Sequence, residues 1–222
     1  MSPAHLANLA IHVGAGTAGL VLGFLILAQP KGTTRHRRLG RWFCVATLVV
    51  SCSAIAGLAL FRFVPLFAVL SVLVPYQLLG GWHAARTRGG GPDALDAAWT
   101  LLAVIATLAL LPALGAAAGA APVVVRASLA GLALLLAYDT LRWLFPRRWH
   151  ARLWRYEHAY KLVSSIFGML SALAGNVVRA WQPWSQLLPS LAGAAVIVYV
   201  LGRLYLEDRG RQAIIEAGAA CR

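Results

Sequence analysis

Residues 31–41 read KGTTRHRRLGR and place five Lys and Arg side chains between two long apolar runs. Apolar runs of about twenty residues are long enough to cross the hydrocarbon core of a bilayer as helices. Short loops rich in Lys and Arg beside such helices stay in the cytoplasm. The stretch therefore predicts the first cytoplasmic turn of a membrane protein, with the amino terminus on the outside.

The composition of the 222-residue chain points to the same class. Hydrophobic residues make up 60% of the chain and charged residues 12%, and the mean hydropathy is +0.71. These values exclude an ordinary soluble domain. The net charge of +13 comes from Lys and Arg that fall mostly in the expected inner half, where all seven acidic residues also lie. Such sorting is typical of membrane insertion and argues against nucleic-acid binding.

The apolar runs predict an all-α fold, a single domain formed by a bundle of seven transmembrane helices. An odd number of spans keeps every basic loop inside, so the carboxyl terminus is expected in the cytoplasm. The first run follows no basic segment, and we expect it to remain in the mature protein. The expected helices cover residues 4–28, 41–63, 65–86, 94–114, 123–145, 157–179 and 184–206, with a cytoplasmic tail over 207–222.

The chain resembles a group of uncharacterised bacterial integral membrane proteins, a family of the domain-of-unknown-function type. In that family a histidine and small residues in the first helix precede a KG…HRxLGR loop. The resemblance implies a bacterial inner (plasma) membrane setting and brings no established activity. The matching residues are His12, Gly16, Gly19, Lys31, Gly32, His36, Arg37, Leu39, Gly40 and Arg41, and, in a second similar segment over 154–176, His158, Met169, Ala172 and Asn176.

Polar side chains inside the expected spans are the candidates for a functional site. Ionisable groups in a bilayer are costly unless they are paired or face a cavity. They fall at two depths. The outer set is His5, His12 and Asn176, and the inner set is Tyr76, Gln77, His83, Asp139, His158 and Lys161, with His36 above it in the loop.

A haem with two axial histidines needs imidazoles from different helices at matched depth. His83 and His158 meet this condition and are the first candidate haem ligands. His12 is a further candidate, but His5 shares its helix, so His12 has no opposite partner. A transition metal such as zinc or copper also accepts imidazole nitrogen. His5 with His12, or His83 and His158 with Asp139, would supply its ligands.

Three functions stay open from the sequence, and whether the protein is an enzyme stays open with them. The first is a histidine-containing bundle that binds a redox cofactor (haem), a metal or a small hydrophobic ligand. The second is a small-solute or proton-coupled transporter, because titratable groups could line a path. The third is an intramembrane enzyme that acts on a lipid or a quinone. The expected partners are a bilayer with anionic headgroups and a second copy or another membrane subunit.

Two contacts follow from helix geometry. Asp139 and Lys161 lie at depths that differ by only about 3 Å at a rise of 1.5 Å per residue, so we expect that they can form an ion pair. Two alternatives stay open: Asp139 has a competing partner in Arg142, one helical turn later, and Lys161 could instead extend to the interface. The stretch 31–41 is expected to dock on anionic headgroups through residues such as Arg37 and Arg41. Within it, His36 is expected to fold back against the inner helix ends.

Overall fold

The computed structural model describes the backbone of residues 2–116 and 123–220, and side chains within 2–115 and 123–210. The described chain is all-α and has no strand in these ranges. Two short 3-10 helices, η2 (Arg142–Leu144) and η3 (Arg179–Trp181), flank the sixth long helix. The long helices are α1 (Pro3–Ala28), α2 (Thr34–Leu60), α3 (Pro65–Thr87), α4 (Ala94–Ala116), α5 (Val123–Leu141), α6 (Arg147–Val177) and α7 (Trp184–Ala220).

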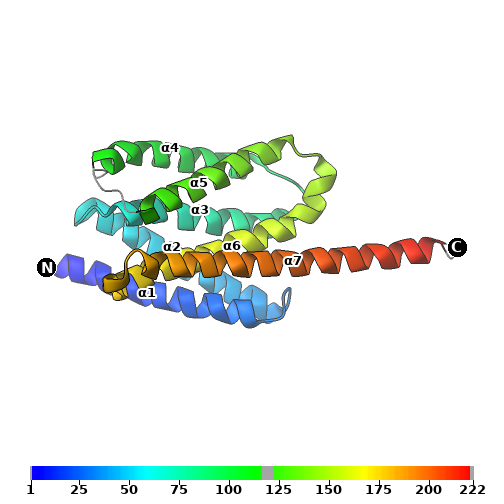
Figure 1. Ribbon diagram of the computed structural model, residues 1–222, viewed down its shortest axis with the longest axis horizontal. Helices are drawn as coiled ribbons and strands as arrows, with labels where there is room; N and C mark the ends of the chain where they lie inside the picture. Colours follow the sequence, from blue (N-terminus) through cyan, green and yellow to red (C-terminus); the bar gives the residue numbers. More distant parts are fainter. Residues whose placement is uncertain (1, 117–122, 221–222) are drawn as a thin grey trace.

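The long helices lie roughly along one direction and alternate in sense (Figure 1). The turns at 29–33, 88–93 and 142–146 gather at the end from which the carboxyl terminus projects, and the amino terminus lies at the opposite end. Helix α3 contacts α2, α4, α5 and α6, while α6 also contacts α1 and α7. Helices α3 and α6 therefore form the centre of the bundle.

Six of the described helices are long and apolar enough to cross a membrane, namely α1, α2, α3, α4, α7 and a segment formed by α5 with η2. The described chain thus has the form of a multi-pass membrane protein. The remaining long helix, α6, begins with an Arg-rich segment. Because α6 packs against α1, α3 and α7, its polar side chains can be covered by protein rather than by lipid.

Helix α2 begins at Thr34, so the expected start at residue 41 was wrong. The hydroxyl of Thr33 accepts a hydrogen bond from the backbone N–H of His36 at 3.1 Å and caps the helix, as Ser and Thr do at helix starts. The ammonium of Lys31 donates to the carbonyls of Ile26 and Leu27 at 2.9 and 2.8 Å and caps the end of α1. The turn is therefore only residues 29–33, and Arg35 to Arg41 lie on the first turns of α2.

Other expected boundaries also moved. Helix α5 ends at Leu141 rather than at 145, and α6 begins at Arg147 rather than at 157. Residues 147–156, which are rich in Arg and Trp and lie between two of the expected helices, are thus helical rather than a loop. The expected tail is helical as far as Ala220, and its last two residues lie outside the described range. At the end of the bundle that holds the amino terminus, α2 stops at Leu60 and α6 at Val177, three and two residues earlier than expected.

Small residues bring the central helices close together. A Cβ atom added at Gly23 of α1 would lie 2.8 Å from Cγ1 of Ile166 on α6. One added at Gly19 would lie 3.6 Å from Cε of Met169. Such spacing of glycines permits close helix packing in membrane proteins.

The clustering of the basic turns at one end generates a topology prediction. In a chain with Cys44, Cys52 and Cys221 replaced by serine, new cysteines at Gly90 and Arg148 should react with a membrane-impermeant maleimide only after the cells are opened. A new cysteine at Arg62, at the opposite end, should react in intact cells, because basic loops stay inside. The reverse pattern of labelling would overturn the orientation.

Candidate functional site

Asp139 of α5 and Lys161 of α6 form an ion pair inside the bundle, which confirms the predicted contact. The ammonium of Lys161 donates to both carboxylate oxygens at 2.7 and 2.9 Å. The two residues are 3% and 1% exposed. Tyr76 of α3 donates its hydroxyl to Asp139 at 2.6 Å and lies 3.0 Å from the hydroxyl of Thr100 on α4. The carboxylate is thus held by groups from α3 and α6.

Two glycines of α3 make room for Lys161. A Cβ atom at Gly80 would lie 3.1 Å from Nζ of Lys161, and one at Gly81 would lie 3.0 Å from its Cβ. The side chain therefore runs across the bare backbone of α3 to reach Asp139. Larger residues at either position would displace the lysine or separate the two helices.

Arg142 of η2 connects this pair to two further acids. Its guanidinium lies 2.5 Å from Asp96 of α4 and 2.5 Å from Glu157 of α6, and Nε lies 3.5 Å from Asp139. Tyr138 adds a hydrogen bond to Glu157 at 2.8 Å. Arg142 is 4% exposed, so these acids compensate a buried charge. The arginine joins η2 to α4 and α6.

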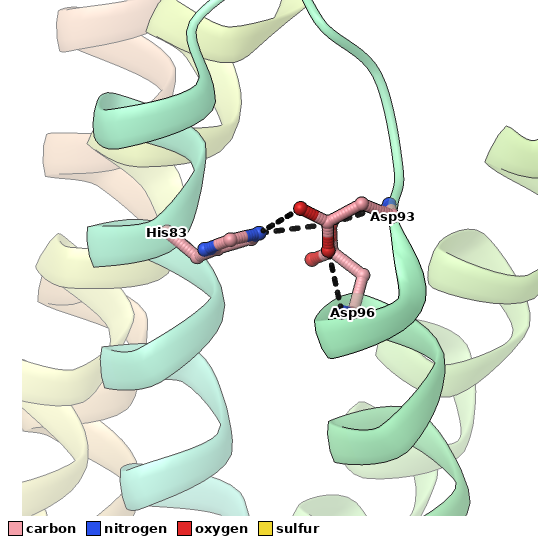
Figure 2. A group of neighbouring side chains, drawn as sticks. All are labelled: His83, Asp93 and Asp96. Carbon is pink, nitrogen blue, oxygen red and sulfur yellow. Dashed lines mark hydrogen bonds and ion pairs between the residues drawn. The ribbon is translucent and has the colours of Figure 1, made fainter.

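The end of the network nearest the protein surface consists of His83, Asp93 and Asp96. Figure 2 shows the imidazole of His83 on α3 directed at the two carboxylates. Nε2 of His83 lies 2.9 Å from Oδ2 of Asp93 and 3.6 Å from Oδ2 of Asp96. His83 and Asp96 are buried, while the side chain of Asp93 is 46% exposed. The cluster is thus buried on one side and open on the other.

The start of α4 fixes the two aspartates relative to each other. Oδ1 of Asp93 accepts from the backbone N–H groups of Leu95 and Asp96, and Oδ2 of Asp96 accepts from the N–H of Asp93 at 3.2 Å. This is a reciprocal capping box. Desolvation raises the pKa of Asp93, but the hydrogen bonds from the Asp96 backbone and from His83 outweigh it and hold that pKa below its usual value. Asp93 is therefore ionised at neutral pH.

The connected network carries more negative than positive charge. With its four carboxylates and two cationic groups counted in their charged forms, the formal charge is −2 when His83 is counted as neutral. Buried charge of one sign is costly without a compensating cation. The carboxylates belong to Asp93, Asp96, Asp139 and Glu157, and the cations to Arg142 and Lys161.

A small hollow adjoins the network. Its volume is about 10 Å³, and Asp96, Arg142, His150 and Glu157 contribute to its lining. This is about the space that one water molecule needs. The hollow therefore suits a bound water but no organic substrate.

The other inner candidates have separate neighbours. Nδ1 of His158 lies 3.0 Å from the carbonyl oxygen of Gly81. The ring of His36 packs edge-on against that of His158, with centroids 6.4 Å apart, which confirms that His36 folds back. Gln77 is buried on α3. His83 and His158 thus hold different partners, and His83 is the one that joins the acidic network.

The outer candidates lie away from this network. His5 stacks on Phe61 with ring centroids 4.4 Å apart. Nδ1 of His12 lies 2.9 Å from the hydroxyl of Ser53. Asn176 donates to the carbonyl of Ala172 on its own helix at 3.0 Å. Each residue is therefore occupied by a local contact, and the two histidines have different neighbours.

Arg142 and three acids of the site were absent from the sequence-based candidates, and the acids are Asp93, Asp96 and Glu157. Each of these acids lies within three residues of an expected helix start, where an acid is usual as a helix cap or at the lipid headgroups. The available signal was charge, since seven acids in a chain this apolar are few enough to test each one. Comparisons with models of protein families, with curated proteins and with solved structures gave no match.

The buried pair generates a stability prediction. Asp139→Asn or Lys161→Met alone should cost about 3–5 kcal/mol of unfolding free energy, because each leaves an unpaired buried charge. The double variant should cost much less than the sum of the two. Unfolding of the purified protein in detergent measures this double-mutant cycle.

The matched control is the ion pair of Arg155 and Glu207, which are 3.3 Å apart and partly exposed. The same cycle with Arg155→Gln and Glu207→Gln should give a coupling of roughly 1 kcal/mol or less. Additive costs at Asp139 and Lys161 would show that the contact contributes nothing as a pair.

Proposed function

We propose that this chain is a membrane protein that binds a divalent transition-metal ion through His83, Asp93 and Asp96. One observation carries the proposal. Within the part of the chain that the structure describes, these three side chains are the one group of ligating residues whose donor atoms all lie within 4.8 Å of one another. They come from α3 and from the start of α4, so binding would join two helices of the bundle.

The donor set fits such an ion. One imidazole nitrogen and two carboxylate oxygens suit zinc, manganese or iron. Metal bonds of about 2.0–2.2 Å require donor atoms that are roughly 3 to 3.5 Å apart. The distances of 2.9 and 3.6 Å from Nε2 of His83 to the two carboxylates support this fit. The exposed side of Asp93 leaves room for water as a further ligand.

The charge of the network favours a divalent ion. With neutral His83 as a ligand, a charge of +2 balances the −2 of the four carboxylates and two cations. Arg142 binds Oδ1 of Asp96, so Oδ2, which faces His83, is the oxygen available to the ion. Arg142 and its contacts would thus orient a metal ligand from outside, as hydrogen-bonded neighbours do in metal sites.

This proposal selects among the functions expected from the sequence. A haem between His83 and His158 has less support, because the rings have separate partners and His83 faces two carboxylates. The hollow beside Arg142 has room for one water molecule only, so it does not support transport of a solute or action on a lipid or quinone. The proposal also includes seven spans in a bacterial inner membrane, with the metal cluster facing the cytoplasm.

Metal titration tests the proposal. Co²⁺ added to the purified, chelator-treated protein should give visible absorption bands, and Zn²⁺ should displace it. Binding of Co²⁺ should be weakened on the order of 100-fold or more by each of three substitutions, His83→Gln, Asp93→Asn and Asp96→Asn. Loss of a residue that only hydrogen-bonds to a metal ligand weakens binding by less, about 10- to 100-fold. Asn at position 93 still caps α4, so this variant separates ligand loss from helix loss.

His12→Gln is the matched control, because His12 is a histidine of the same bundle that bonds to Ser53 instead. Its affinity for Co²⁺ should equal that of the original protein. Absence of binding to the original protein would refute the proposal, as would an affinity unchanged from that of the original protein in all three ligand variants.

A further inference from the structure

A surface groove on the first turns of α2 is separate from the metal cluster. It has a volume of about 360 Å³ and is lined by Arg38, Arg41, Trp42 and Val45. The spacing of three, four and seven residues places them on one stripe of the helix. Trp42 and Val45 are 60% and 52% exposed, so the protein itself leaves the groove uncovered.

The order of side chains along the stripe matches a phospholipid. Arg38 and Arg41 lie nearest the turn at 29–33, Trp42 follows at the level where aromatic residues meet headgroups, and Val45 lies further along the span. A phospholipid presents its phosphate, glycerol and acyl chain in the same order across the interface. The groove thus offers cations to the phosphate and an apolar wall to the chain.

The two arginines, Arg38 and Arg41, have no partner among the residues that the structure describes. Neither guanidinium forms a hydrogen bond or an ion pair with the residues that the structure describes. Arg142 and Arg155, by contrast, bind carboxylates. Guanidinium groups bind phosphate in a bidentate manner, so these two groups are free for an anion from outside.

We propose that this groove binds one anionic phospholipid, with its phosphate on Arg38 and Arg41 and an acyl chain along Trp42 and Val45. The inference is independent of the metal site. A nucleic acid or an acidic peptide would offer anions but no acyl chain for the apolar wall. Bare phosphate would use the arginines alone.

Fluorescence quenching by brominated lipids tests this site. Phosphatidylglycerol with brominated acyl chains, titrated into the purified protein in neutral detergent, should quench tryptophan at lower lipid fractions than phosphatidylcholine with the same chains. Trp42→Phe should remove the part of the quenching that depends on the headgroup. Equal quenching by the two lipids in the original protein would overturn the proposal. Competition of inorganic phosphate with the lipid, in a form of binding that makes no contact with Trp42, would overturn it as well.

The arginines are tested with a matched charge control. Arg38→Gln with Arg41→Gln should shift the midpoint for phosphatidylglycerol roughly thirtyfold, because each cationic side chain at an anionic surface contributes about fivefold. Arg147→Gln with Arg148→Gln removes the same charge from the exposed start of α6 and should leave the midpoint unchanged. Equal shifts in both double variants would show general attraction instead of a site. If the first variant does not fold, the comparison of the original protein with Trp42→Phe still decides the question.

Discussion

The ammonium of Lys161 and the carboxylate of Asp139 meet inside the bundle, where both are almost fully buried. The half of the bundle that holds the turns at 88–93 and 142–146 is arranged around that contact. An ion pair in such a place is tolerated only when its remaining hydrogen-bonding capacity is filled. The hydroxyl of Tyr76 donates a further hydrogen bond to Asp139, and the glycines of α3 leave space for Lys161 to reach that carboxylate. The close packing of α3 against α6 therefore allows the buried charges of Lys161 and Asp139 to pair.

The same requirement extends outward through Arg142. Once Arg142 is buried beside Asp139, it needs Asp96 and Glu157, and Asp96 then stands next to His83. A charge placed deep in the bundle thus determines which side chains gather near its surface. The proposed metal site uses the open end of this series, where Asp93 is still accessible to solvent. The proposed lipid groove on α2 lies outside the series, and no described residue pairs with its two arginines as Asp96 and Glu157 pair with Arg142.

Features that depend on how far along a helix a residue lies could be predicted from the sequence. Features that depend on the rotation of a helix about its axis, or on how its ends are capped, were not predicted. Apolar run lengths gave the helices, and a rise of 1.5 Å per residue gave the Asp139 to Lys161 pair. Depth alone does not say which way a side chain faces, so the convergence of Asp96 and Glu157 on Arg142 was not predicted. The early start of α6 was missed because its Arg and Trp residues were interpreted as a loop, whereas they also suit a helix at the interface. The cap by Thr33 was visible in the sequence but was not weighed against the charge of the stretch that follows.

The short connection between α5 and α6 has a consequence for how the chain enters the membrane. Without α6, Asp139 of α5 and Arg142 of η2 would lack Lys161 and Glu157 as partners. The few residues of 142–146 join the two helices and bring Lys161 to Asp139 and Glu157 to Arg142, in addition to the contacts that α3 and α4 provide. Because pairing offsets the cost of a buried charge, insertion of α5 and α6 as one helical hairpin would cost less than insertion of either helix alone.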